Sequence, residues 1–124
     1  MAGSQIKKRI LIIEDDGDTS DLLQLIAGQL NFEVTASSGL LPVTDIRAIS
    51  PDLILLDHWV NNGYGGDLCL ELKSDVVTNT IPVVMLSAHT NIDQIARKSG
   101  ANSYLEKPFD LNDLESVIKK YTAL

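Results

Sequence analysis

Four short apolar runs of this 124-residue sequence are each followed directly by residues that can bind a cation or an anion. In chain order these residues are Glu14, Asp15 and Asp16, then Asp57, then Ser87 and Ala88, then Glu106 and Lys107. If the runs are parallel strands of one sheet, their carboxyl ends bring several carboxylates, a hydroxyl and a lysine to one edge. Ligands bind at that edge in open α/β sheets, so the chemistry is expected there.

Carboxylates gathered in this way repel one another, and each pKa unit of mismatch costs about 1.36 kcal/mol. Protonation or a hard cation relieves the repulsion. Mg²⁺ fits, because it takes one or two protein carboxylates and leaves room for phosphate oxygens. Lysine adds a compact positive charge and a hydroxyl adds a hydrogen-bond donor. A carboxylate nucleophile, a metal, a lysine and a hydroxyl together indicate a phosphoryl-acceptor site.

Two kinds of segment alternate along the chain and must position these residues. Short continuous apolar runs predict buried strands, and apolar residues at helical spacing predict helices. The predicted strands are 9–13, 32–36, 53–56, 83–86 and 103–105, and the predicted helices are 18–30, 39–49, 66–74, 91–99 and 110–121. Five strand-then-helix units predict an α/β fold, a doubly wound parallel sheet with helices on both faces.

Several residues mark where the predicted helices begin and end. Pro42 is early enough to be tolerated in the first turn of helix 39–49. Asp16 is interpreted as a helix cap or a solvated charge in preference to a metal ligand. Asp110 is interpreted as a helix cap. Gly100 follows helix 91–99, where glycine is a good residue for leaving a helix.

Length and composition favour one globular domain: 124 residues with 44% hydrophobic residues. The net charge of −7 is evidence against direct nucleic-acid binding or an anionic membrane surface. No run approaches the roughly 20 apolar residues of a membrane span, and no signal peptide is recognisable. We therefore expect a soluble, cytoplasmic protein, with 1–8 a disordered or tag-derived N-terminus and 9–124 the domain. Cys69 is the only cysteine and is interpreted as a packing residue.

From about Arg9 to the C-terminus the sequence resembles bacterial response-regulator receiver domains of two-component signalling. The matching fragments are ILIIEDD at 10–16, PDLILLD at 51–57, Gly65, IPVVMLSA at 81–88, Gly100-Ala101 and YLEKPF at 104–109. Each fragment is short, and their order and spacing together carry the resemblance. It implies a flavodoxin-like (βα)5 fold with strand order 2-1-3-4-5.

The resemblance also implies a phosphorelay site that uses Mg²⁺ or Mn²⁺. Asp57 would be the phosphoacceptor, receiving its phosphoryl group from a histidine kinase or a histidine phosphotransferase. Asp15 would bind the metal directly and Glu14 more through water, with Asp57 and the backbone carbonyl of Trp59 completing the protein ligands. The protein would not be an enzyme beyond its own phosphorylation and dephosphorylation.

Further residues would contact the phosphoryl group and transmit its presence. By resemblance, Ser87 and the backbone N–H of Ala88 would contact the phosphoryl group and Lys107 would pair with it. Ser87 and Tyr104 would form the switch that reshapes the surface of the fourth helix, fifth strand and fifth helix. That surface would signal to a downstream target protein or to a fused output domain.

The sequence departs from the receiver pattern after Asp57. Receivers usually have Met-Pro where this chain has Val60-Asn61, so we expect a freer loop, with Asn62-Gly63 as a turn-forming pair. Pro108 follows the lysine, where many receivers have a cis peptide bond.

Two unusual residues lie two positions beyond the matching aspartate and serine. By the same resemblance, Trp59 and His89 would flank the route of hydrolytic water. An indole over the phosphoryl group, large and with no acceptor, predicts slow dephosphorylation. The alternatives are that Trp59 points away and packs on the neighbouring loop, and that His89 positions the water. His58 and His89 have no metal-pair spacing and are interpreted as structural or modulatory.

Three alternatives were compared with the receiver interpretation. A pseudo-receiver used only for interaction usually lacks the aspartate or the lysine, and both are present. For a haloacid-dehalogenase-like phosphatase, the hydroxyl pattern of 16–20 is displaced by one position, and Ser87 and His89 stand where an acidic pair is needed. A flavin-binding protein would need hydroxyls and backbone donors, not acids, after the first strand.

Overall fold

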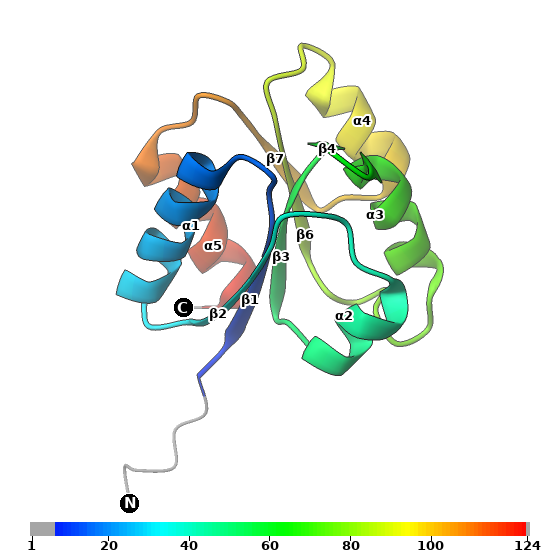
Figure 1. The fold of residues 1–124 in the computed structure, drawn as a ribbon, viewed down its shortest axis with the longest axis horizontal. Coiled ribbons are helices and arrows are strands. Elements are labelled where there is room, and N and C mark those ends of the chain that lie inside the picture. The colour runs from blue at the N-terminus through cyan, green and yellow to red at the C-terminus, as the bar shows by residue number, and fades with distance from the viewer. Residues whose placement is uncertain (1–6, 124) are drawn as a thin grey trace, which may run out of the picture.

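A five-stranded parallel sheet forms the centre of the molecule (Figure 1). The computed structural model describes residues 7–123. The strands are β1 (Arg9–Ile13), β2 (Glu33–Ser37), β3 (Leu53–Asp57), β6 (Val83–Ser87) and β7 (Ser103–Glu106). Their order is β2-β1-β3-β6-β7, which is the predicted order 2-1-3-4-5 when only the strands of this sheet are counted.

Helices cover both faces of the sheet (Figure 1). The helices are α1 (Gly17–Gln29), α2 (Val43–Ile49), α3 (Gly65–Ser74), α4 (Ile92–Ser99) and α5 (Leu111–Thr122). One hydrophobic core joins α1 and α5 to the sheet, and a second core joins α2, α3 and α4 to the opposite face. The doubly wound α/β prediction is therefore confirmed.

Burial differs between the central and the edge strands. In β3 and β6 every residue is buried, and in β1 only Arg9 is exposed. The edge strands β2 and β7 are largely exposed or half-buried, with Glu33 and Thr35 open to solvent. The expectation that all five runs are buried on both sides was thus wrong for the edges, because an edge strand has a neighbour on one side only.

The helix predicted over 39–49 begins later, at Val43, and the prediction of its start was wrong. Pro42 is the residue that precedes the helix, with an extended backbone (φ −60°, ψ 150°). A residue before proline is disfavoured in the helical region, so Leu41 cannot continue a helix into Pro42. The other predicted elements differ from the structure by one residue at most at each end, and Asp16 and Asp110 cap α1 and α5 as expected.

The segment after Asp57 is a short β-hairpin rather than a free loop. Strands β4 (Trp59–Val60) and β5 (Gly63–Tyr64) pair antiparallel, and Asn61 and Asn62 form the connection. Gly63 has φ +152°, a conformation that side chains rarely adopt, and it lies in β5 instead of in the turn. These strands were not predicted, because a strand of two residues is too short to give a hydrophobic pattern.

Lys8, directly before β1, is hydrogen-bonded to two other parts of the chain. The Lys8 carbonyl accepts a hydrogen bond from Glu33 N (2.9 Å), and its Nζ donates to the carbonyl of Thr122 (2.5 Å). Residues 1–6, which belong to the segment predicted to be disordered or tag-derived, lie outside the described residues. Within 7–123, no helix has the length and apolar character needed to cross a bilayer.

Candidate functional site

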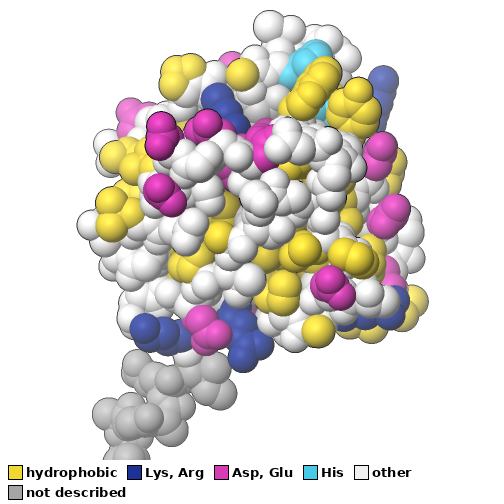
Figure 2. All heavy atoms as spheres, viewed as in Figure 1, with side chains coloured by type: hydrophobic (Ala, Val, Ile, Leu, Met, Phe, Trp, Pro, Cys, Tyr) yellow, Lys and Arg dark blue, Asp and Glu magenta, His cyan; other side chains and the backbone are white. Residues whose placement is uncertain are grey.

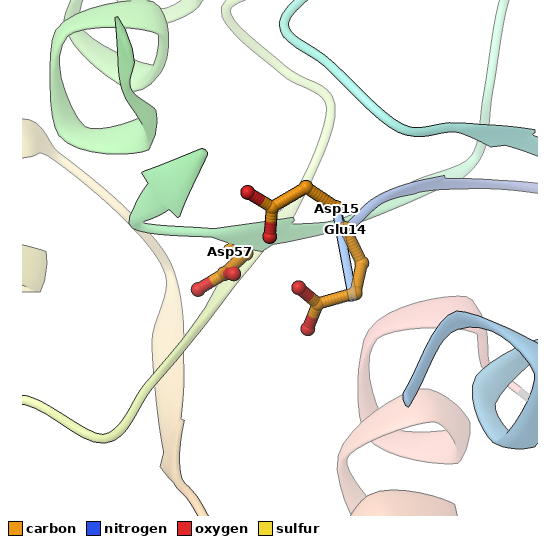
Figure 3. A group of neighbouring side chains, drawn as sticks. All are labelled: Glu14, Asp15 and Asp57. Carbon is orange, nitrogen blue, oxygen red and sulfur yellow. The ribbon is translucent and has the colours of Figure 1, made fainter. Parts of the chain in front are cut away.

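Three carboxylates meet at the carboxyl edge of the sheet. Glu14 and Asp15 follow β1, and Asp57 is the last residue of β3. One carboxylate oxygen of each lies within 4.8 Å of those of the other two. Glu14 and Asp57 are buried and Asp15 is half-buried. Figure 3 shows the three carboxyl groups around a shared space, although Asp57 is more than forty positions from the other two along the chain.

The Lys107 ammonium group lies against two of these carboxylates. Its Nζ is 2.5 Å from Glu14 Oε1 and 3.4 Å from Asp57 Oδ2. Burial lowers the pKa of Lys107, but hydrogen bonds to Glu14 and the charges of Asp57 and Glu14 outweigh it and raise the pKa overall. The pKa of Glu14 is raised by burial and by its hydrogen bond with Asp57, against the opposing effect of Lys107.

Ser87 and Ala88 form another side of the site. Ser87 ends β6 and is buried, and its Oγ accepts a hydrogen bond from His89 N at 2.9 Å. The Ser87 hydroxyl hydrogen is free of that bond and available to an acceptor. An open pocket of about 280 Å³ is lined by Asp57, Trp59, Ser87, Ala88, His89 and Lys107. The hydroxyl, the lysine and the phosphoacceptor candidate therefore share one cavity.

Trp59 forms the rim of this pocket. Its side chain is 60% exposed and packs edge-on against Tyr64, with ring centroids 5.3 Å apart. Its backbone N–H donates to Asp57 Oδ1 at 3.4 Å. Figure 2 shows acidic side chains along the upper part of the visible face, with histidine and hydrophobic side chains beside one another to the upper right.

Asp16 and Tyr104 lie outside the cluster. Asp16 caps α1: Thr19 N and Oγ1 donate to its Oδ2 at 2.9 Å and 2.6 Å, which lowers the pKa of Asp16. Tyr104 lies on β7, two residues before Glu106, which is the register partner of Ser87. It is 38% exposed and borders a pocket that includes Ala96 of α4.

Sequence reasoning gave no physical role to Gly65 and no contact to His58, which it interpreted as structural or modulatory. A Cβ on Gly65 would lie 2.2 Å from the Asp57 carbonyl oxygen, so only glycine lets the start of α3 approach the phosphoacceptor candidate this closely. His58 Nδ1 accepts from Gly66 N at 3.1 Å, and its ring stacks on Tyr64. His58 therefore has a structural contact, because its ring nitrogen accepts a hydrogen bond from the first turn of α3. The peptide bond between Lys107 and Pro108 is cis.

The donor set fits a hard divalent cation. Three carboxylates outnumber the single lysine that contacts them, and oxygen donors are what Mg²⁺ and Mn²⁺ prefer. A carboxylate nucleophile at Asp57, a lysine and a hydroxyl at an open pocket are suited to accept a phosphoryl group.

Comparison with known proteins gives a consistent answer. Residues 10–119 match the family described as response regulator receiver domain. The chain is 34% identical over 115 residues to the phosphate regulon transcriptional regulatory protein PhoB of Escherichia coli (strain K12), covering 90% of this chain and 50% of PhoB. It is 30% identical over 117 residues to the DNA-binding response regulator MtrA of Mycobacterium tuberculosis (strain ATCC 25618 / H37Rv), covering 92% of this chain and 50% of MtrA. The chain thus spans about half the length of these relatives.

A solved structure agrees with this match. The receiver domain of NtrX from Brucella abortus superimposes with a TM-score of 0.80 and is 29% identical, covering 92% of this chain and 98% of that one. The similarity therefore extends over nearly the whole of both chains.

Proposed function

The chain belongs to the response regulator receiver domain family of two-component signalling, and from this premise we propose that it accepts a phosphoryl group on Asp57 from a phosphohistidine donor. The observation that supports the proposal is the contact of Lys107 with the buried Asp57, within a cluster of three carboxylates that are suited to a divalent cation. The donor would be a histidine kinase or a histidine phosphotransferase.

In the proposed transfer, a carboxylate oxygen of Asp57 attacks phosphorus and the P–N bond of the phosphohistidine breaks. Its electron pair stays on the imidazole nitrogen, so the products are an aspartyl phosphate and a free histidine. Asp15 and Asp57 would hold Mg²⁺ or Mn²⁺ directly, Glu14 would act through water, and the backbone carbonyl of Trp59 would complete the protein ligands. The cation would neutralise charge on the phosphoryl oxygens.

Lys107, Ser87 and Ala88 would bind the transferred group. Lys107 already faces Asp57, so its ammonium can pair with a phosphoryl oxygen after a small movement. The Ser87 hydroxyl and the Ala88 backbone N–H border the same pocket and can donate to the remaining oxygens. No chemistry on another substrate is needed, and we propose that the protein promotes only its own phosphorylation and dephosphorylation.

Phosphorylation would act as a switch through Ser87 and Tyr104. It adds about −1.5 to −2 charges and new acceptor oxygens at Asp57. Ser87 would move toward these oxygens and Tyr104 would turn toward the vacated space, reshaping the surface of α4, β7 and α5. Tyr104 is 38% exposed and borders the pocket beside α4, which is consistent with such a turn.

The recipient of the signal would be a target protein or an output domain. MtrA is named a DNA-binding response regulator, and this chain matches half of its length. We propose that the described domain signals by docking and does not itself bind DNA, since its net charge of −7 would repel the phosphate backbone.

Intact-protein mass spectrometry after incubation with acetyl phosphate and Mg²⁺ tests the proposal. One phosphoryl group is expected on the wild type, and none on Asp57→Asn, on Asp15→Asn or in excess EDTA. Asp21→Asn, an exposed carboxylate on α1, is the matched control and should be phosphorylated like the wild type. A wild type that stays unmodified would instead identify a pseudo-receiver, and modification of Asp57→Asn would place the acceptor elsewhere.

A further inference from the structure

The tip of the β4–β5 hairpin is bound to a loop from another part of the chain. Leu40 N donates to Asn62 Oδ1 at 2.8 Å, and Asn62 Nδ2 donates to the Leu40 carbonyl at 3.2 Å. The Asn62 side chain thus satisfies both backbone groups of one residue, 22 positions away. Within 7–123, these are the only hydrogen bonds that join the hairpin to the loop between β2 and α2.

The close packing around this amide supports a fixed arrangement. A Cβ on Gly39 would lie 3.1 Å from Asn62 Oδ1, and a Cβ on Gly63 would lie 2.9 Å from Leu40 Cδ1. The loop and the hairpin are therefore closely packed at both glycines, and a side chain at either position would displace the Asn62 amide or the end of the Leu40 side chain. We call the pairing of Asn62 with Leu40 the amide clasp.

The hairpin is held at its base as well as at its tip. Gly65 N donates to the His58 carbonyl at 2.7 Å, and Val60 is buried in the core beneath α2, α3 and α4. Trp59 lies between the base and the clasp and pairs with Tyr64. The position of the Trp59 backbone therefore depends on both ends of the hairpin.

We propose that Asn62 is a positioning residue for the metal site: the amide clasp holds the hairpin so that the Trp59 carbonyl is in place for Mg²⁺. The inference rests on the proposed function. Ligand groups must be held within about 0.5 Å of their working geometry. This chain has Val60-Asn61 where receivers usually have Met-Pro, so the clasp supplies a restraint that the missing proline ring does not.

The test compares Asn62→Ala with Asn61→Ala, the neighbouring exposed residue of the same connection, which makes no side-chain hydrogen bond among the described residues. Trp59 is the only tryptophan, so its fluorescence reports a Mg²⁺ titration at the site. Asn62→Ala should bind Mg²⁺ about 10-fold more weakly, the lower end of what removing an outer-shell partner causes. Asn61→Ala should bind it like the wild type.

Two further measurements separate positioning from general destabilisation. Hydrogen exchange of the Leu40 amide should be slow in the wild type and in Asn61→Ala, and fast in Asn62→Ala. The urea midpoint of metal-free Asn62→Ala should fall only by the contribution of the two lost hydrogen bonds, and the protein should stay folded in the Mg²⁺ titration.

Four outcomes are informative: three would overturn the inference, and the fourth would remove the proposed function. Unchanged Mg²⁺ affinity in Asn62→Ala with fast Leu40 exchange would overturn the inference, as would a Leu40 amide that is unprotected in the wild type. Equal weakening in Asn61→Ala would overturn it too. A wild type that binds no Mg²⁺ would instead remove the proposed function on which the inference rests.

Discussion

At the scale of single residues, Lys107 and Asp15 have different electrostatic surroundings. Lys107 contacts Glu14 and Asp57, whereas no ion pair within 7–123 includes Asp15. Asp15 therefore adds negative charge to the cluster without direct compensation, which is the charge that a bound cation would balance.

Replacing Asp15 by asparagine should abolish Mg²⁺ binding and leave the fold intact. Removing one of three repelling carboxylates should leave the free energy of unfolding of metal-free protein unchanged, or raise it by less than about 1 kcal/mol, because Asp15 is half exposed. Urea unfolding with and without Mg²⁺ checks both parts. A marked loss of stability in metal-free Asp15→Asn would contradict this electrostatic account.

Trp59 should slow the loss of the phosphoryl group. Its indole lines the pocket at Asp57 and offers no acceptor to orient a water molecule. Trp59→Asn should therefore dephosphorylate faster, by up to about 10-fold, since one hydrogen bond contributes about 0.5–1.5 kcal/mol. His89→Ala should slow the decay if the imidazole positions water.

The decay of phosphorylated protein at fixed pH and Mg²⁺ concentration is the measurement. An unchanged or slower rate in Trp59→Asn would show that the indole, whose exposed side chain packs on Tyr64, does not guard the phosphoryl group.

Gly65→Ala should damage both stability and phosphorylation. The new Cβ would lie 2.2 Å from the Asp57 carbonyl oxygen, so the backbone on one side must move. Overpacking of this kind costs about 1–3 kcal/mol in the free energy of unfolding. Gly28→Ala is the matched control: nothing lies within 4 Å of its Cβ, and an exposed helical alanine should stabilise by up to about 1 kcal/mol. Equal free energies of unfolding for Gly65→Ala and Gly28→Ala in urea would show that Gly65 does not approach the Asp57 carbonyl this closely.

At the scale of elements, the central strands and most helices could be predicted because their signals are long and local. Continuous apolar runs predict β3 and β6, and helical spacing predicts α5. The start of α2 could not be predicted from periodicity, because Pro42 precedes the helix instead of entering it. The hairpin was missed because each strand has two residues and its restraint, Leu40, is distant in sequence.

The candidate site was predictable to a similar degree. Strand-end positions brought Asp15 and Asp57 to one edge, which follows from parallel strands alone. The sequence did not predict which carboxylate Lys107 contacts most closely. Its contact with Glu14 depends on side-chain packing between residues 93 positions apart. The close approach of Gly65 had no local signal beyond the resemblance to the family.

Asp75 joins α2 to the segment after α3 and should make stability depend on pH. Arg47 of α2 pairs with its carboxylate, and Val77 N and Thr78 N each donate to its Oδ2 at 3.0 Å. These bonds hold the pKa of Asp75 well below its usual 3.8. A depressed pKa in the folded state means that the stabilisation is complete above about pH 3.8 and is lost as the pH falls through the folded value.

Asp75→Asn should therefore unfold at lower urea concentration than the wild type at neutral pH. The difference in midpoint should be the same at about pH 7 and 5 and should shrink toward about pH 3, where Asp75 of the unfolded wild-type chain takes up a proton while the folded carboxylate stays ionised. Glu71→Gln, an exposed acid of α3, is the control and should show no such convergence. A difference in urea midpoint between wild type and Asp75→Asn that grows as the pH falls would contradict the prediction.

At the scale of the whole molecule, the acidic edge and the α4–β7 surface are connected through the sheet. Lys107 N donates to the Ser87 carbonyl at 2.9 Å, so the end of β6 is bonded to the residue that follows β7. Tyr104 lies on that same strand and faces the pocket beside α4. The proposed movement of Ser87 would therefore act on β7, the strand that carries Tyr104, the proposed switch residue.

Binding of a phosphoryl mimic should shift the amide NMR signals of residues 91–107. A complete change from 1:99 to 99:1 would need about 5.5 kcal/mol of differential interaction, so we expect a partial shift in populations. Ser87→Ala should bind the mimic yet lose most of the shift at Tyr104, because the hydroxyl that moves is gone. The amides of α2 provide the internal control. This helix belongs to the same core as α4, and it follows β2, the strand at the opposite edge of the sheet from β7. Identical spectra over 91–107 with and without the mimic would exclude Tyr104 as the switch, whereas equal changes in α2 would indicate a general loosening of the domain and not a directed movement.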